Sequence, residues 1–252
     1  MIRLSSGAAT DVGNVRQMNQ DLALEADGLF GVADGMGGHV GGEVASRTAI
    51  EALRSTFEQA NGPPSIRDLV GAVGAANLAV WNQALTDEDL RGMGTTLTAM
   101  ALVTEDGVAE IALVNVGDSR AYRLRDGTFA QLTADHTMVE EMVRIGELSA
   151  REAASHPRRH VLTRSIGNEP DVEVDAWLVR PVDGDRLLLC SDGLFNEVDD
   201  DSISDVLGEV ADPAEAAAEL VRRALENGGS DNVTVVVVDV AGEDDSAGSG
   251  PG

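Results

Sequence analysis

The chain has 252 residues, of which 43% are apolar, so it is long enough for one large domain or two small ones. Its formal net charge of −26, from 44 acidic and 18 basic residues, argues against nucleic acid or an anionic membrane as a partner. Every basic residue is an arginine, and the lack of lysine excludes Schiff-base catalysis and a lysine-dependent phosphate-binding loop.

The first third of the chain predicts strands followed by two helices. Residues 1–33 have the pattern of strands, with a hairpin turn at residues 27–28. Apolar residues at helical spacing predict a helix over residues 43–59. Ser65 can cap a second helix over residues 66–85, whose many apolar residues indicate that it covers a sheet.

The middle of the chain predicts two hairpins, residues 97–116 and residues 119–132, each with an Asp-Gly turn. Hairpins that follow one another along the chain predict an antiparallel sheet. Two short helices are expected over residues 138–145 and 149–155. Residues 157–160 are irregular, and we expect them to form a mobile segment, called the flap below.

The last third of the chain mixes both kinds of element. Strands are predicted at residues 172–179, 186–190 and 233–240. Helices are predicted at residues 202–210 and at residues 213–227, the second with proline in its first turn.

We expect one α+β domain over residues 1–240, with the sheets in the centre and the helices outside. No segment within that range has the composition of a linker, and acidic residues that belong together fall on both its first and its last strands. We expect the domain to be a monomer. Residues 241–252 are rich in glycine, serine and acidic residues, which predicts a disordered tail.

Cysteine usage and the lack of long apolar stretches bear on localisation. The single cysteine, Cys190, lies in an apolar run and is interpreted as a packing residue. One cysteine permits no intrachain disulfide, and no signal peptide is recognisable, so we expect a cytoplasmic protein. No apolar stretch approaches the roughly 20 residues that a membrane span needs.

Three acidic residues stand at the ends of strongly apolar runs. Asp34 and Asp192 each follow such a run, and Asp231 comes just before one. A carboxylate beside a buried strand is costly unless it has a partner, and few arginines lie near these residues in the sequence. A bound metal is therefore the favoured partner, although a strand-end cap would explain any one of them alone. We predict that the three acids converge on metal ions that perform hydrolysis.

The chemistry of the predicted ligands limits the choice of metal. Carboxylates without cysteine or paired histidines suit Mg²⁺ or Mn²⁺ better than Zn²⁺. Two such ions roughly 3.5–4 Å apart can share a water and make hydroxide from it near neutral pH. Asp34 could bridge the two ions, and the backbone carbonyl of Gly35 could add a further ligand.

Two other residues could complete phosphoryl transfer. Arg16 could hold a phosphate through its planar guanidinium, or it could be a surface arginine in a polar loop. His39 follows the glycine-rich loop after Asp34 and could protonate the leaving group, or it could be structural.

Eight motifs between about residue 5 and residue 240 form an ordered series. They are Arg16-x-x-Asn19-Gln20-Asp21, Val32-Ala33-Asp34-Gly35-Met36-Gly37-Gly38-His39, Gly94-Thr95-Thr96, Val116-Gly117-Asp118-Ser119-Arg120, Leu132-Thr133-x-Asp135-His136-Thr137, Arg164-x-Ile166-Gly167, Ser191-Asp192-Gly193-Leu194 and Ser230-Asp231-Asn232. As a set, the motifs resemble the signature series of the metal-dependent protein Ser/Thr phosphatases of the protein phosphatase 2C family, in its compact bacterial form.

The resemblance implies a four-layer α-β-β-α sandwich with two central antiparallel sheets. It implies hydrolysis of phosphoserine and phosphothreonine in proteins by a hydroxide that bridges two metal ions. The resemblance also implies a role for each site residue. Asp34 bridges the two ions, Gly35 binds one of them, and Asp192 and Asp231 bind the other. Asp118 helps to hold a third ion, Asp21 orients metal-bound water, and Arg16 holds the phosphate.

The resemblance also implies phosphoprotein substrates, with reversal of bacterial Ser/Thr kinase signalling and the kinase itself as a possible partner. A regulatory antagonist of an anti-sigma factor is an alternative substrate. Two other interpretations stay open: a non-catalytic relative that senses phosphoprotein, and a structural metal protein such as a Ca²⁺ binder. The first is disfavoured by the complete set of Asp34, Asp192 and Asp231, and the second leaves Arg16 without a role.

Overall fold

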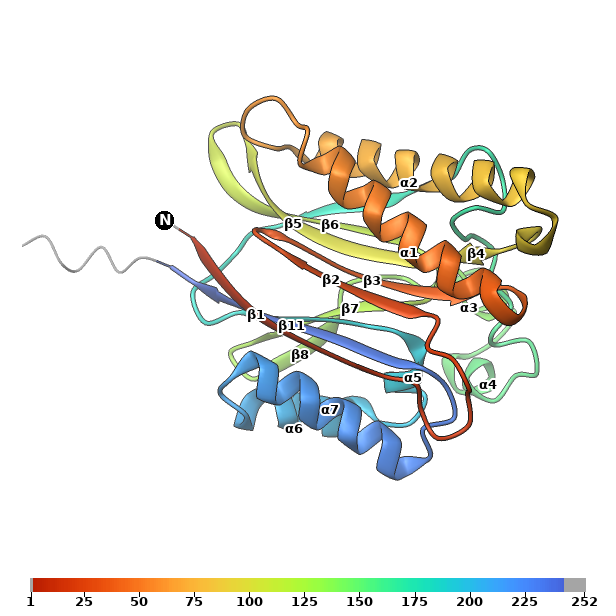
Figure 1. Ribbon diagram of the computed structural model, residues 1–252. Coiled ribbons are helices and arrows are strands. Elements are labelled where there is room, and N and C mark those ends of the chain that lie inside the picture. Colours follow the sequence, from red (N-terminus) through yellow and green to blue (C-terminus); the bar gives the residue numbers. More distant parts are fainter. Residues whose placement is uncertain (1, 243–252) are drawn as a thin grey trace, which may run out of the picture.

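The computed structural model describes residues 2–242, apart from the side chains of residues 38, 39 and 154. It has four layers, in the order helices, sheet, sheet, helices (Figure 1). All strand pairs between the elements are antiparallel. The predicted α+β sandwich with two central antiparallel sheets is therefore confirmed.

One sheet brings together the two ends of the domain. Its strands, in spatial order, are β1 (Arg3–Asp11), β11 (Val233–Ala241), β10 (Arg186–Cys190), β7 (Arg120–Arg125) and β8 (Thr128–Gln131). The first strand of the chain pairs along its whole length with the last. This pairing joins the two ends of the described part of the chain in one sheet.

The other sheet is built from the first half of the chain and one later strand. Its strands, in spatial order, are β2 (Asp21–Ala26), β3 (Leu29–Met36), β5 (Leu97–Glu105), β6 (Val108–Val116) and β9 (Asp175–Val179). A short strand, β4 (Gly94–Thr95), pairs with the end of β3.

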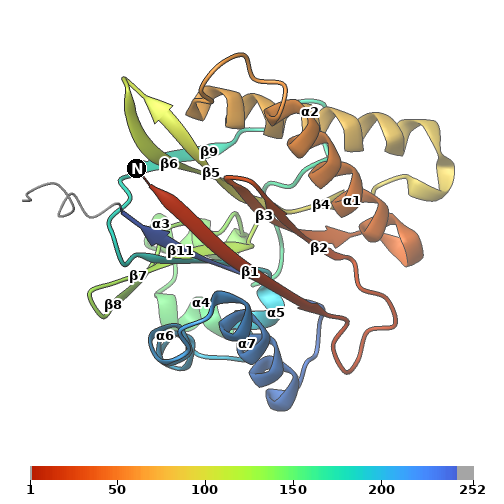
Figure 2. The same ribbon diagram turned by 60° about the vertical axis from the view of Figure 1, so that its left-hand side comes forward.

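Helices cover the outer face of each sheet, and Figure 2 shows the two helix layers on opposite sides of the paired sheets. Against the β2–β9 sheet lie α1 (Gly38–Phe57) and α2 (Ile66–Thr86), and against the β1–β8 sheet lie α6 (Asp200–Glu209) and α7 (Pro213–Asn227). The shorter elements are η1 (Glu88–Leu90), α3 (Met138–Arg144), α4 (Ala150–Ala154) and α5 (Asp192–Phe195). Ser65 caps α2 in a reciprocal capping box with Asp68, as its position predicted.

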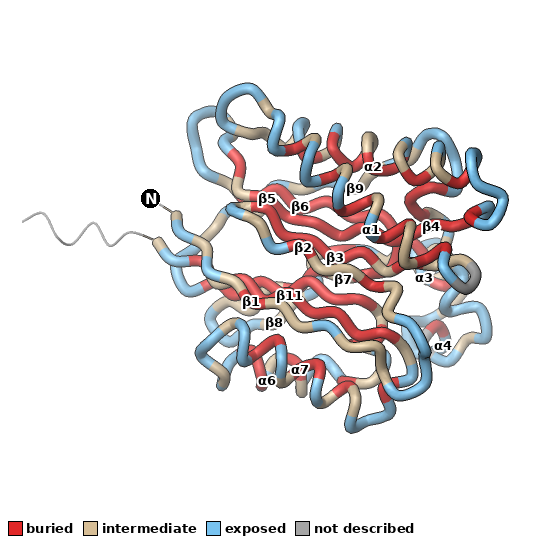
Figure 3. Tube along the Cα trace, in the orientation of Figure 1, coloured by how far each residue is buried: buried red, intermediate tan, exposed pale blue. Residues whose placement is uncertain are grey.

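The buried residues form three apolar layers, one between the sheets and one under each pair of helices (Figure 3). The last strand shows why its sequence is apolar without alternation. Val233, Val235 and Val237 pack against the α6–α7 side, whereas Val236 and Val238 pack between the sheets. Both faces of this strand are covered, so both need apolar side chains.

The structure differs from the sequence prediction mainly at element ends. Helix α1 begins at Gly38 instead of residue 43, β9 begins at Asp175 instead of residue 172, and α5 and η1 were not predicted. Strand β11 ends at Ala241, the first residue of the predicted tail. The rest of that prediction concerns residues 243–252, which lie outside the described residues. None of the helices that the structure describes is long and apolar enough to cross a bilayer.

Candidate active site

Acidic side chains from both sheets gather at one edge of the sandwich. Asp21 begins β2 and pairs in register with Asp34 of β3, and Asp118 follows the end of β6. Asp192 follows β10 and Asp231 precedes β11, so these two come from the other sheet. A cavity of about 1070 Å³ is lined by four of the five carboxylates, namely Asp34, Asp118, Asp192 and Asp231.

The backbone around Asp34 is held on both sides. Its N–H donates to Thr96 Oγ1 at 3.0 Å and its carbonyl accepts from the Thr96 N–H at 2.9 Å. The residue was expected at a strand end, but it lies inside β3, because β4 extends the pairing to Met36. Gly35 must be glycine here, since a Cβ would stand 2.1 Å from the carbonyl oxygen of Gly42. This close approach fixes the turn from β3 into α1.

Asp21 is the most enclosed of the five. Ser191 Oγ donates to Asp21 Oδ2 at 2.7 Å, across 170 positions of sequence, and in turn accepts from the N–H of Thr234 at 2.9 Å. Asp21 Oδ1 is buried and has no hydrogen-bond partner in the described part of the chain. An unpaired buried carboxylate oxygen is costly, so it marks a place for a water or an ion.

The five carboxylates disfavour one another's charge. Burial raises the pKa of Asp34 well above its ordinary value, and the charges of Asp21 and Asp192 raise it further. Burial likewise raises the pKa of Asp21 to about 7 and that of Asp118 to about 7. The pKa of Asp192 is raised by burial and then by the charge of Asp231. A cation in the cavity would offset both the cost of burying these charges and the repulsion between them.

Arg16 places a permanent positive charge at this centre. Its Nη2 donates to Asp231 Oδ2 at 2.6 Å, and its side chain is 55% exposed. Nothing in the local sequence predicts this pair, because the two residues are 215 positions apart. Asn232 holds the loop that carries Arg16, because its amide donates to the carbonyls of Val12 and Met18 at 2.9 Å each. The loop is thus anchored on both sides of Arg16, and the exposed guanidinium between these anchors can bind a carboxylate or a phosphate.

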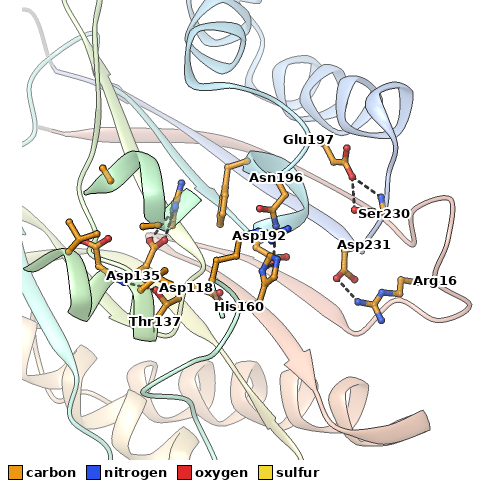
Figure 4. A pocket seen from close by; sticks show the side chains of 18 residues that line it. Arg16, Asp118, Asp135, Thr137, His160, Asp192, Asn196, Glu197, Ser230 and Asp231 are labelled. Atoms are coloured by element: carbon orange, nitrogen blue, oxygen red, sulfur yellow. Dashed lines mark hydrogen bonds and ion pairs between the residues drawn. The ribbon is translucent and has the colours of Figure 1, made fainter. Parts of the chain in front are cut away.

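A second hollow of about 1100 Å³ adjoins the first, and Arg159 and His160 of the flap line it (Figure 4). His160 at the end of the flap lies beside Asp192, with 3.7 Å between His160 Nδ1 and Asp192 Oδ2. The side-chain amide of Asn196 donates a hydrogen bond to Asp192 Oδ2 at 3.1 Å. The end of the flap therefore lies next to the carboxylates.

The donor set limits how an ion could be held. Among residues 2–242, no three acidic, histidine or cysteine side chains are close enough together to hold one ion by themselves. One or two carboxylates per ion, completed by water, is how Mg²⁺ is usually bound. The unpartnered Asp21 Oδ1 and the mutual repulsion of the carboxylates fit this arrangement, so the residues present suit Mg²⁺ or Mn²⁺.

The structure brings together all but one of the predicted site residues. Asp21, Asp34, Gly35, Asp118, Asp192, Asp231 and Arg16 all lie at this edge of the sandwich. His39 lies in α1, but its side chain is outside the described residues. Sequence reasoning assigned no role to Ser191, Asn232 or His136, although all three stand in the quoted motifs and contact this centre or its loops.

Fold and site together define a class: an α-β-β-α sandwich with a carboxylate centre where its two sheets meet. The sequence profile described as "Protein phosphatase 2C" matches residues 14–227. This chain therefore belongs to the protein phosphatase 2C family.

Individual relatives agree with this assignment. The serine/threonine protein phosphatase PstP of Mycobacterium tuberculosis is 42% identical over 241 residues, covering 96% of this chain and 46% of the relative. The serine/threonine phosphatase Stp of Listeria welshimeri is 37% identical over 91% of this chain and 93% of its own. The crystal structure of a PstP catalytic domain in complex with two manganese ions superposes with a TM-score of 0.84, at 40% identity over 96% of this chain and all of that one.

The relatives differ in extent. This chain spans about half the length of the mycobacterial relative, at 46%, and nearly all of the Listeria one.

Proposed function

We propose that this protein hydrolyses phosphoserine and phosphothreonine esters in proteins, with two divalent ions, Mn²⁺ or Mg²⁺, in the carboxylate centre. The observation that carries the proposal is the group of five carboxylates at one edge of the sandwich, four of which line one cavity with Arg16 as their neighbouring cation. The ions supply Lewis acidity, which activates water and neutralises charge on the phosphoryl oxygens.

The positions of the acids support distinct roles. Asp34 lies close enough to carboxylates of both sheets for their charges to act on it, so it is the proposed bridge, and Gly35 lines the same cavity with a carbonyl that could bind one ion. Asp192 and Asp231, from the other sheet, would hold the second ion. Asp118, which lines the same cavity, would help to hold a third ion.

Two side chains would act on the reactants. Asp21 would orient a water through Oδ1, the oxygen that lacks a partner among the described residues. Arg16 would exchange Asp231 for the substrate phosphate, since a carboxylate and a phosphate offer the same bidentate acceptor geometry. We propose His39 as the acid that protonates the leaving oxygen. Its test is loss of turnover in His39→Gln for an alkyl phosphate but not for an aryl phosphate, whose leaving group needs no proton.

The proposed substrates and setting follow from this activity. Phosphoproteins made by Ser/Thr kinases, and a kinase itself, are the proposed partners of a domain that acts as a monomer. The single thiol, Cys190, is buried and free, which suits the reducing cytoplasm as the proposed location.

The test is hydrolysis of a panel of phosphoserine, phosphothreonine and phosphotyrosine peptides with and without Mn²⁺. We expect turnover of the first two classes, loss of turnover with a chelator, recovery on adding Mn²⁺, and no turnover in Asp192→Asn. Asp126→Asn is the matched control: this aspartate lies in a hairpin turn with φ of 50°, a conformation that asparagine also adopts.

Full activity after all metal has been stripped, or in Asp192→Asn, would overturn the proposal. Metal-dependent melting without turnover would instead indicate a structural metal site.

A further inference from the structure

His136 is a buried histidine whose two ring nitrogens face different parts of the molecule. The residue is 5% exposed. Its Nδ1 accepts from the N–H of Gly117 at 3.1 Å, and its Nε2 lies 3.2 Å from Asp175 Oδ2. The ring therefore bridges the loop after β6 and the first residue of β9.

These partners fix the tautomer of the ring. Because Nδ1 accepts a hydrogen bond from a backbone N–H, the proton of the neutral ring is on Nε2, which donates to Asp175 and also lies 3.3 Å from Arg164 Nη1. Arg164 Nη1 donates to the other oxygen of Asp175 at 2.6 Å. The carboxylate of Asp175 thus orients both the ring and the guanidinium.

On one side, His136 holds the peptide that precedes Asp118. Gly117 donates its N–H to the ring, and its carbonyl accepts from the His136 N–H at 2.9 Å. Gly117 has φ of 111°, and a Cβ there would stand 2.6 Å from the side chain of Thr96, so this turn requires glycine. The direction of the Asp118 carboxylate depends on that turn.

On the other side, the same stretch holds residues 161–164, which follow the flap and are called the flap stem here. The carbonyl of His136 accepts from the Thr163 N–H at 2.8 Å. Thr137 forms a β-bridge with Leu162, and the Met138 N–H donates to the carbonyl of Val161 at 2.8 Å.

We propose that His136 is a positioning residue that couples the flap stem to Asp118. Its ring sets the Gly117 turn that aims this carboxylate, and its backbone carries the stem of the flap, two of whose residues line the same hollow as Asp118. This proposal depends on the proposed function in one respect, namely that Asp118 helps to hold a third ion.

Two substitutions separate the two ring contacts. Asn at position 136 can keep an acceptor near the place of Nδ1, whereas Gln can reach Asp175 with a donor but loses the acceptor for Gly117. In the metal-free protein, we expect amide exchange of Gly117 to be at least about tenfold faster in His136→Gln, because that N–H loses its partner, and nearly unchanged in His136→Asn. His156→Gln is the control, a histidine before the flap whose ring accepts from Arg158.

A double-mutant cycle tests whether the effect passes through Asp118. A supporting residue of this kind typically changes metal affinity about 10–100-fold. We therefore expect His136→Gln to raise the Mn²⁺ concentration for half-maximal hydrolysis about tenfold, and less than about twofold when Asp118 is already Asn. Effects that multiply in the double variant would overturn the proposal, as would equal Gly117 exchange in the Gln and Asn variants.

A reciprocal measurement needs no variant of His136. If the two regions are coupled, Mn²⁺ binding at Asp118 must slow amide exchange of Thr163 in the wild-type protein, and must not do so in Asp118→Asn. Unchanged Thr163 exchange in wild type saturated with Mn²⁺ would overturn the coupling. Since exchange needs no turnover, this result is distinct from a failure of the proposed phosphatase activity.

Discussion

The two ends of strand β10 handle buried charge in opposite ways. At its start, Arg186 is only 10% exposed in its side chain, and its guanidinium donates to Asp239 and to the carbonyls of Leu207, Val210 and Ala211. At its end, the strand leads into Asp192, whose pKa is raised by burial and by the charge of Asp231. At the start of the strand, the chain supplies the counterion of the buried arginine. At its end, the neighbouring carboxylates repel one another.

The difference separates a structural charge from a functional one. A buried charge whose partners are all supplied by the chain stabilises the fold only as a complete group, and removing one member leaves the others unpaired. Carboxylates that the chain itself does not neutralise need a cation from solution. The acidic cavity of about 710 Å³ near Arg186 is therefore a poor candidate for a site, whereas the cavity at Asp192 is a good one.

The largest effect is expected at the functional end. Asp34→Asn should lower kcat by about a thousandfold, because a metal contribution of several kcal/mol is lost and each 1.36 kcal/mol is tenfold in rate. The metal-free variant should melt at the same temperature as wild type or higher, because one repelled charge has been removed. Steady-state kinetics and thermal melting check both parts. Wild-type turnover in this variant, or a lower melting temperature without metal, would show that Asp34 is a structural charge and not a functional one.

The opposite result is expected at the structural end. Arg186→Leu should lower the free energy of unfolding by about 3 kcal/mol, since Asp239 and three carbonyls lose their donor. Its kcat/KM, measured well below the melting temperature, should not change. Urea unfolding gives the stability, and Arg180→Leu, at an exposed arginine, is the control with an expected change within about 0.5 kcal/mol. A stable Arg186→Leu would mean that the buried pairs contribute little.

Arg16 lies between these extremes, because it pairs with a carboxylate but stays exposed. Arg16→Ala should lower kcat/KM for a phosphopeptide about 30-fold, which corresponds to the loss of a hydrogen bond to a charged group. Arg16→Lys should recover only part of the lost kcat/KM, since lysine cannot bind a phosphate bidentately. The stability of the metal-free protein should hardly change, because an exposed ion pair contributes little. Equal kinetics in all three proteins would remove the phosphate role of Arg16.

The smallest effect concerns pH. The pKa of Asp118 is about 7 in the fold and near 3.9 in an unfolded chain, so between those values the folded state holds a proton that the unfolded state has lost. This contribution to stability is complete below about pH 4 and disappears as the pH rises through about 7. With a chelator present, Asp118→Asn should therefore gain a few degrees in Tm over wild type at pH 7.5 and clearly less at pH 4.5. A difference independent of pH would show that Asp118 is not forced to hold its proton.

Much of the fold could be read from local patterns. The apolar runs around Val233 and Leu187, the hairpin turns and the helix cap at Ser65 depend on residues close together in sequence. Element ends were less predictable. Helix α1 begins in a glycine-rich stretch that disfavours helix, and it forms there because Gly35 and Gly42 pack closely in the tertiary structure. Asp34 similarly stays within a strand because β4 pairs beyond it.

By itself, the sequence determined the residue types of the centre: carboxylates beside strands, one arginine in a polar loop, and no lysine. Only the tertiary structure decided which of these residues come together and which other side chains hold them in place. Asp21 faces Asp34 through strand register, Ser191 reaches Asp21 across 170 positions, and Asp231 pairs with Arg16 across 215. Local sequence fixes the path of each strand, but only the pairing of distant strands sets the distance between their ends, and that distance controls both the repulsion and the chemistry.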